Sequence, residues 1–260
     1  MIATTFGALF ASAAILLQPN GGAFALAHHA LSNATPAQQA SFDRGLTLYY
    51  AYNGAQGVRV FQAAVDQDPK FAMGYWGLAL SYGPDINNDL TEEHFNRAHL
   101  AIEKAVSLES SLPPQERTYI DTMRVRYAGP WKDHVNAENA YRNAMATAVA
   151  RYPADDDLAS LYVEALLEKT GYLAWKPGTN TPASSNTPIM ASLVDRILAR
   201  DPEHIMANHL QIHLYGSAVD QTKAEAAAKR LDAMSFVPED EHLAHMPAHT
   251  WVHVGSYARA

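Results

Sequence analysis

The stretch Tyr75-Trp76-Gly77-Leu78-Ala79-Leu80-Ser81-Tyr82 decides the fold that we predict for this chain. Its large side chains recur at intervals of three and four residues, which places them on one face of a helix. Upstream, Gly57, Phe61 and Ala64 repeat this spacing, and Asp68-Pro69 follows, where the proline stops a helix. The small residues let two helices approach closely. The two stretches therefore predict successive helices of a repeating helix-pair unit.

This unit has the pattern of the tetratricopeptide repeat. Tyr75-x2-Leu78-Ala79-x2-Tyr82 fits its first helix, with Ala in place of the usual Gly, and Gly57-x3-Phe61 with Ala64 fits its second helix. Less regular copies follow: the second unit closes near Ala105, a third pair spans 114–152, a fourth opens after Asp155 and holds a loop at 175–188, a fifth contains 208–215, and a sixth begins at Ala244. We predict an all-α solenoid of antiparallel helix pairs over residues 28–260, with about five and a half repeats.

The sixth unit stops at Ala260, where its second helix has barely begun. Terminal repeats of a solenoid need a polar outer face. We therefore predict that the sequence is C-terminally incomplete, or that the uncapped repeat forms a homodimer.

The first 17 residues carry no charged side chain, and the first Lys or Arg is Arg44. Ala23-Phe24-Ala25 and Ala25-Leu26-Ala27 both fit an A-x-A cleavage site. We predict a signal peptide at residues 1–27 and a periplasmic or secreted protein. The alternative is an apolar N-terminal helix that stays as an anchor. The apolar stretch is shorter than the about 20 residues that a spanning helix needs, and we expect no membrane span in the mature chain.

The composition excludes several classes of function. The chain has 19 Lys and Arg against 27 Asp and Glu, so its net charge of -8 argues against binding to nucleic acid. It has no Cys, which excludes disulfides, thiolate metal sites and thiol nucleophiles. It has 12 His, and seven of them fall between His204 and His253. Imidazole is therefore the side chain to examine.

These histidines are spaced for helix faces. His209 and His213 are four residues apart, and His245, His249 and His253 follow one another at the same interval. His209 and His245 are 36 residues apart, as are His213 and His249. Since a tetratricopeptide unit has about 34 residues, the two pairs occupy equivalent places in successive units. In that repeat these places face the concave groove.

Several neutral imidazoles that converge in a groove predict a transition-metal site for copper or zinc, and an open coordination position would make the protein a metal-dependent enzyme of unknown reaction. We predict His209, His213, His245, His249 and His253 as ligands. Proline is tolerated in the first turn of a helix, so Pro247 places the helix start near Met246. His242 then lies in the loop before it, as a second-shell or weaker candidate. Packed, capping histidines and a pH-sensitive groove are the alternatives.

A non-catalytic scaffold is the alternative function. Such a protein would bind a peptide, a partner protein or a small molecule in the same groove, with Phe42 and Trp76 as an apolar floor. Glu164 and Glu168, four residues apart, have the spacing of paired carboxylates, but we expect them to form a solvated acidic face.

The chain also resembles a group of bacterial, often exported, tetratricopeptide-repeat proteins of poorly defined function. The resemblance covers residues 38–260. It implies the repeat fold and export, and its most specific motifs are the two that contain the paired histidines. The motifs are Phe42-Asp43-Arg44-Gly45-Leu46, Asp68-Pro69 with Ala72-Met73-x-Tyr75-Trp76-Gly77, Tyr152-Pro153-x-Asp155 with Leu161-Tyr162-x-Glu164-Ala165-Leu166, Asn208-His209-Leu210-x-Ile212-His213, and His242-Leu243-x-His245-Met246-Pro247-x-His249. Gly216 stands where the family usually has Glu, which removes a local general base.

Overall fold

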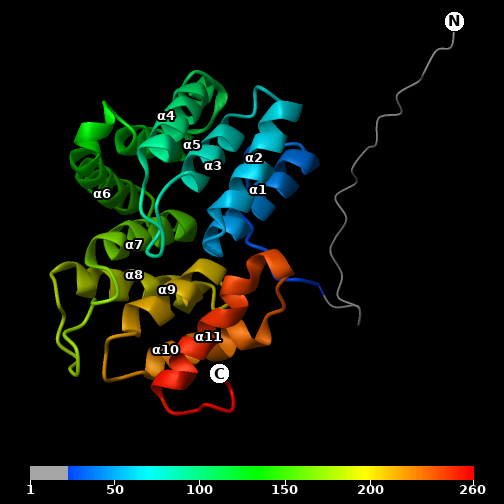
Figure 1. Ribbon diagram of the computed structural model, residues 1–260. Helices are drawn as coiled ribbons and strands as arrows, with labels where there is room; N and C mark the ends of the chain where they lie inside the picture. Colours follow the sequence, from blue (N-terminus) through cyan, green and yellow to red (C-terminus); the bar gives the residue numbers. More distant parts are fainter. Residues whose placement is uncertain (1–22) are drawn as a thin grey trace, which may run out of the picture.

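The computed structural model describes residues 23–260, which form eleven α-helices, three short 3-10 turns and no β-strand (Figure 1). Most of the predicted signal peptide lies outside the described residues. No helix between residues 23 and 260 is long and apolar enough to cross a membrane. The helices are α1 (Pro36–Tyr50), α2 (Gly54–Gln67), α3 (Ala72–Ser81), α4 (Glu92–Val106), α5 (Pro114–Arg126), α6 (His134–Arg151), α7 (Asp156–Thr170), α8 (Asn186–Arg200), α9 (Ile205–Tyr215), α10 (Thr222–Ala233) and α11 (Glu241–His253).

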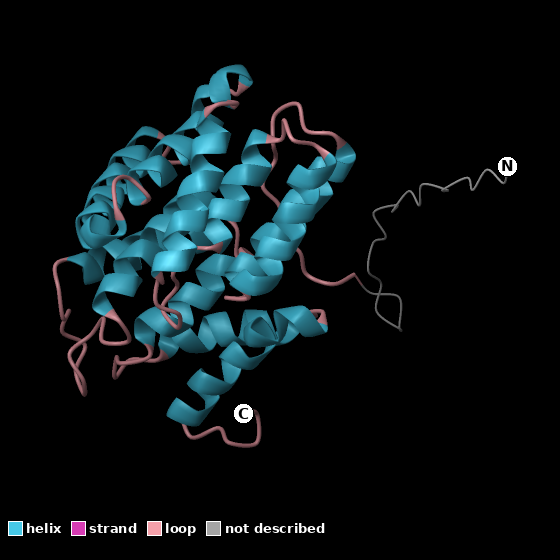
Figure 2. Ribbon diagram, turned by 45° about the horizontal axis from the view of Figure 1, so that its top comes forward, coloured by secondary structure: helices cyan, strands magenta, loops and turns pink. Residues whose placement is uncertain are grey.

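Consecutive helices pack side by side, from α1 with α2 to α9 with α10, and α11 packs on α10 (Figures 1 and 2). The prediction of an all-helical chain built from helix pairs is therefore confirmed. Five pairs and a single eleventh helix also agree with the expected number of units. Whether each pair is a tetratricopeptide repeat remains a prediction.

Local sequence explains where the helices begin and end. Thr35 caps α1 in a capping box with Gln38, and Asp155 caps α7 by accepting a hydrogen bond of 2.9 Å from the backbone N–H of Leu158. Gly171 ends α7 at a φ of 59°, a left-handed conformation that glycine adopts without strain. The third helix pair, predicted over residues 114–152, corresponds to α5 and α6. The fourth pair begins with α7 directly after Asp155, as predicted.

Glycine brings the first three helices together around Phe61. A Cβ atom at Gly45 of α1 would lie 2.4 Å from the Phe61 ring, and one at Gly77 of α3 would lie 2.2 Å from it. Real Cβ atoms do not approach that closely, so the ring of Phe61 in α2 fills space that only glycine leaves open. The predicted role of small residues is confirmed here.

The array curls until its first helix meets its last ones. Ala25 donates a backbone hydrogen bond of 2.7 Å to Ser235, and Arg44 of α1 pairs with Asp240 at 2.6 Å. Helix α1 also packs against α9, which lies far from it in the sequence (Figures 1 and 2). A solenoid unit usually contacts only its neighbours. Here α1 covers the face of α9 that we expected to line an open groove.

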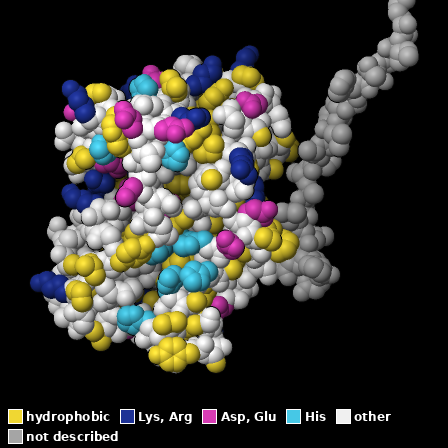
Figure 3. Space-filling view, in the orientation of Figure 1, with side chains coloured by type: hydrophobic (Ala, Val, Ile, Leu, Met, Phe, Trp, Pro, Cys, Tyr) yellow, Lys and Arg dark blue, Asp and Glu magenta, His cyan; other side chains and the backbone are white. Residues whose placement is uncertain are grey.

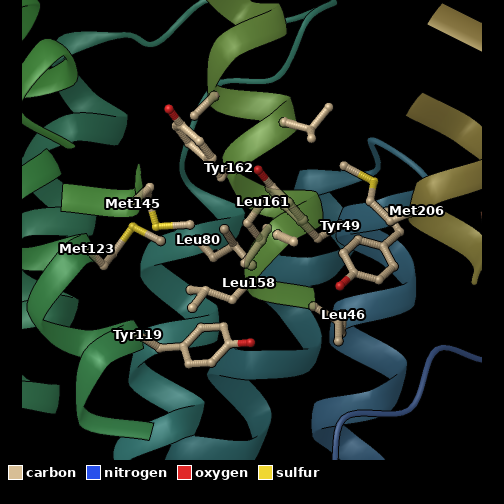
Figure 4. Packing of buried hydrophobic residues seen from close by; sticks show 14 of the residues in the cluster. Leu46, Tyr49, Leu80, Tyr119, Met123, Met145, Leu158, Leu161, Tyr162 and Met206 are labelled. Carbon is tan, nitrogen blue, oxygen red and sulfur yellow. The ribbon is translucent and has the colours of Figure 1, made fainter. Parts of the chain in front are cut away.

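Buried side chains from helices far apart in the sequence form one large core. Figure 4 shows part of it, where Leu46 and Tyr49 of α1 meet Leu158 and Leu161 of α7 and Met206 of α9. These contacts tie the first, fourth and fifth helix pairs together. They hold α9 rigidly against α1 and α7, and α9 carries two of the candidate site residues.

Four side chains lie deeper than we predicted from the sequence. Phe42 and Trp76 are 1% and 2% exposed and stack with their ring centroids 5.8 Å apart, so the structure buries them in the core instead of presenting them to a ligand. The expectation of a solvated face for Glu164 and Glu168 was wrong. Glu164 accepts a hydrogen bond of 2.7 Å from the hydroxyl of Tyr49, and Glu168 forms a bidentate ion pair with the buried Arg126.

Candidate metal centre

Helix α9 is buried along its whole length and carries His209 and His213 toward α1 and α11. His209 is 0% exposed and His213 is 7% exposed. The helix begins at Ile205 because the ring of His204 caps it, with Nδ1 accepting a hydrogen bond of 3.2 Å from the backbone N–H of Ala207. The interval of four residues then places both imidazoles on one face, as predicted.

The third member of the cluster is His242, in the first turn of α11. Nε2 of His209 lies between the other two rings. It is 3.1 Å from Nε2 of His242 and 3.0 Å from Nε2 of His213. One ring nitrogen from each of the three residues lies within 4.8 Å of the other two. We call His209, His213 and His242 the histidine triad. Figure 3 shows histidine side chains gathered on the face of the molecule over α9 and α11.

Hydrogen bonding determines which nitrogen of His209 is free. Nδ1 lies 2.8 Å from the backbone carbonyl of Tyr50, which only accepts, so Nδ1 carries the proton. Nε2 is left with one lone pair, which can accept only one good N–H bond although two ring nitrogens approach it. A cation among the three nitrogens satisfies all of them. Two ligand nitrogens on a tetrahedral zinc ion lie about 3.3 Å apart, close to the spacing seen here. The triad can therefore hold a metal ion.

The triad is neutral near pH 7. Burial, and then the neighbouring imidazoles His213 and His242, lower the pKa of His209 well below its usual value. Burial, and then His242 and His249, lower the pKa of His213 to about 3, and burial and the imidazoles of His245 and His249 lower the pKa of His242 to about 4. Metal ions bind the unprotonated imidazole, so the ligands already have the form that binding requires.

Tyr52 forms one wall of the triad. The centroid of its ring lies 4.3 Å from that of His209, 5.7 Å from that of His213 and 5.3 Å from that of His242. Its backbone has a φ of 54°, and its hydroxyl is buried without a hydrogen-bond partner in the described part of the chain. No spacing in the sequence points to Tyr52, because it reaches the triad only through the packing of α1 on α9.

The remaining predicted ligands lie outside the triad. His245 and His249 contact each other, with ring centroids 4.7 Å apart, and both are exposed on α11. His253, one turn further on, is also exposed. The structure therefore groups His209 and His213 with the weaker candidate, His242. The other three continue from this group along α11, since the ring of His245 lies 6.4 Å from that of His242 and His249 and His253 line the same cavity as His213 and His242.

The position of His242 was mispredicted because of Pro247. We expected the helix to start near Met246, whereas α11 starts at Glu241 and contains Pro247 in its second turn. The interval of three residues between His242 and His245 was the available signal, since it continues the stripe by one turn.

A second group of potential ligands is a satisfied hydrogen-bond network. His29 and His204 both contact the carboxylate of Asp157, at 2.7 and 3.3 Å, and Tyr50 donates its hydroxyl to it. Asp155 accepts hydrogen bonds from Tyr119, Gln115 and the N–H of Leu158. Because the carboxylate of Asp157 only accepts, Nδ1 of His29 carries the proton and is not free to bind a metal alongside Asp155 and Asp157. This network ties the segment before α1 to the ends of α7 and α9.

Comparison with known proteins returned no match: no protein-family model, no curated protein and no solved structure matches this chain. The function is therefore inferred from the chemistry of the triad itself.

Proposed function

We propose that this protein binds a transition metal ion, copper or zinc, through His209, His213 and His242. The observation that carries the proposal is the convergence of three ring nitrogens, with Nε2 of His209 at 3.0 and 3.1 Å from the other two. The carbonyl of Tyr50 orients His209 through its other nitrogen, as an outer hydrogen-bond partner does in metal sites.

The donor set favours copper or zinc. Imidazole nitrogen suits both metals, and the chain has no Cys to supply a softer ligand. Three protein ligands leave one coordination position open, the arrangement found in catalytic zinc sites, so we propose a metalloenzyme without assigning its reaction. Gly216 ends α9 close to the triad and offers no side chain as a general base. We retain the predicted tetratricopeptide fold and export as part of this proposal.

The alternative, a non-catalytic scaffold, has less support. It needs an accessible groove, and the residues that we expected on its floor, Phe42 and Trp76, are buried. A buried cluster of three neutral imidazoles also has no role in docking a peptide. We therefore prefer the metal site.

The test is metal retention by untagged protein. After loading with zinc or copper and dialysis against a weak chelator, the wild-type chain should retain about one equivalent, as one site with three protein ligands requires. The double variant His209→Ala with His213→Ala should retain none. The control is His94→Ala, which removes an exposed histidine of α4 far from the triad in the sequence and should leave retention unchanged.

Thermal unfolding gives a second measurement. A ligand that binds only the native state raises its stability, by about 4 kcal/mol when its concentration is 1,000 times the Kd. The melting temperature of the wild-type chain and of His94→Ala should rise with metal, and that of the double variant should not. Equal retention by wild type and double variant, or a melting temperature that metal leaves unchanged, contradicts the proposal.

A further inference from the structure

A cavity of about 470 Å³ lies directly beside the triad. His213 and His242 form part of its wall, so any position left open on an ion bound by the triad can face it. Helices α9 and α11 provide most of the wall, and the loops after α3 and α7 provide the rim.

The cavity is lined without formal charge. Among the described residues around it there is no Lys, Arg, Asp or Glu. The contrast with the larger cavity of about 840 Å³ near the N-terminal segment is clear, since six carboxylates line that one: Glu116, Asp155, Asp156, Asp157, Asp201 and Glu203. A charged group that lies in this cavity away from the metal ion loses hydration and finds no side chain of opposite charge. The lining therefore favours a ligand whose body, beyond the donor atom on the metal, is uncharged.

One polar group in the wall lacks a partner. Thr250 is 2% exposed, and its hydroxyl has no hydrogen-bond partner within residues 23–260. A buried hydroxyl left unpaired destabilises the protein, and such groups in native structures usually have a reason. By contrast, the amide nitrogen of Gln221 is already committed to the carbonyls of Tyr215 and Ala218, at 2.8 and 2.7 Å. Thr250 is thus a buried polar side chain of this wall whose hydroxyl is left for a polar atom of a ligand to pair with.

Apolar side chains form the rest of the cavity. Ile212 and Met246 are buried in its floor, while Leu173 is 55% exposed at its rim. Tyr172, beside Leu173, hydrogen-bonds to Asn87 and so joins the two rim loops. A volume of this size lies within the range of about 300–1,000 Å³ that holds small organic ligands.

We propose that this cavity binds a small organic molecule with an uncharged body, which places an oxygen or nitrogen donor on the open position of the metal ion. The apolar body of the molecule contacts Ile212, Met246 and Leu173, and a polar group of the molecule pairs with the hydroxyl of Thr250. This inference deepens the proposed function and rests on it, because it needs an ion at the triad.

Pyridines substituted at carbon 4 test the inference, because they share one donor nitrogen and differ only at the far end. The protein is loaded with cobalt(II), and the binding of each pyridine is followed by the visible absorption of the metal. We expect 4-ethylpyridine to bind about tenfold tighter than pyridine, as the burial of two carbon atoms allows. Pyridine-4-carboxylate, which is charged at the far end, should bind no tighter than pyridine.

Two variants distinguish contact between the substituent and the cavity wall from the effect of pyridine basicity on metal binding. Leu173→Ser changes an exposed rim residue and should reduce the preference for 4-ethylpyridine over pyridine at least threefold. Thr250→Val keeps the shape of the side chain but removes the hydroxyl. It should weaken the binding of 4-acetylpyridine about threefold to tenfold, the effect of one hydrogen bond, and leave 4-ethylpyridine unchanged.

The outcomes distinguish this inference from the metal site. If cobalt is retained but the pyridines bind equally, or if pyridine-4-carboxylate binds tightest, the triad is a metal site and the cavity inference is wrong. If Leu173→Ser and Thr250→Val both leave the preferences unchanged, the pyridines bind elsewhere and the inference is also wrong. If the chain retains neither cobalt nor zinc, the metal site and the cavity inference both fail.

Discussion

The ring of Tyr52 lies 4.3 Å from the ring of His209, centroid to centroid, although the backbone of Tyr52 is held in the left-handed region at a φ of 54°. The residue sits just past the end of α1, where the N–H of Asn53 bonds back to the carbonyl of Leu48. Glycine is the usual residue at this place in a helix C-terminal motif. A non-glycine residue there costs about 1–2 kcal/mol. The wall that the ring provides for the triad is the compensating contact.

The hydroxyl of Tyr52 is expected to contribute nothing to stability. It faces the carboxyl group of Glu164 without a hydrogen bond of good geometry, so Tyr52→Phe removes a weakly paired hydroxyl and keeps the ring. The free energy of unfolding in urea should stay the same or rise by up to about 1 kcal/mol, and metal retention should not change. A loss of more than 1 kcal/mol would show that the hydroxyl is paired in solution.

Stability of the metal-free protein should fall in acid because of the triad. The folded pKa of His213 is about 3, below the ordinary value of 6.5, since burial and nearby imidazoles disfavour its charge. Below pH 6.5 the unfolded chain therefore binds a proton that the folded chain does not. This group's contribution is full above pH 6.5 and decreases by about 1.4 kcal/mol per pH unit as the pH falls from 6.5 toward 3.

Urea unfolding of metal-free protein between pH 7 and pH 4.5 measures this slope. His213→Gln removes the titrating group, and the variant should lose less stability than the wild type over the same range. His94→Ala, which alters an exposed histidine, should follow the wild-type slope. Parallel curves for wild type and His213→Gln would contradict the explanation.

Helix boundaries and helix faces depend on local spacing and can be predicted from the sequence. Contacts between helices far apart in the chain form because the array curls, and spacing does not predict them. The helix pairs and the shared face of His209 and His213 follow from intervals of three and four residues and from caps and prolines. His242 joins them because α11 packs directly on α9, and because α1 packs on both α9 and η3 (Pro238–Asp240), which precedes α11. Spacing also could not show which face of α7 is buried, because Tyr49 and Arg126, the partners of its two glutamates, come from α1 and α5.

Glu164 should reduce stability at alkaline pH. Burial and the neighbouring Glu168 raise its pKa well above the ordinary value of 4.5, so the folded chain keeps a proton that the unfolded chain releases. Stability is therefore lost as the pH rises above 4.5. Glu164→Gln supplies an uncharged side chain of the same shape that still accepts the hydrogen bond from Tyr49.

Denaturant unfolding at pH 5 and pH 8 tests this. The difference in the free energy of unfolding between Glu164→Gln and wild type should favour the variant more at pH 8 than at pH 5, because only the wild-type chain loses stability as Glu164 resists giving up its proton. Asp66→Asn is a matched control, because Asp66 is exposed on α2. If the free energies of unfolding of Glu164→Gln and Asp66→Asn, each relative to wild type, change equally between pH 5 and pH 8, then burial beside Glu168 does not raise the pKa of Glu164.

Gly77→Ala should strongly destabilise the fold because α3 has no room for a methyl group. The added Cβ would lie 2.2 Å from the Phe61 ring, so the ring or the helix must move. Overpacking of a core costs about 1–3 kcal/mol, and this contact is severe enough to expect the upper end of that range. Urea unfolding measures the loss.

Gly216→Ala is the control. At Gly216 the nearest atom to an added Cβ is 3.4 Å away and φ is -56°, so this variant should change stability by less than about 0.5 kcal/mol. Phe61→Leu combined with Gly77→Ala should recover part of the loss, because a smaller side chain leaves the methyl group space. Additive losses in the double variant would mean that Gly77 is needed for a reason other than its contact with Phe61.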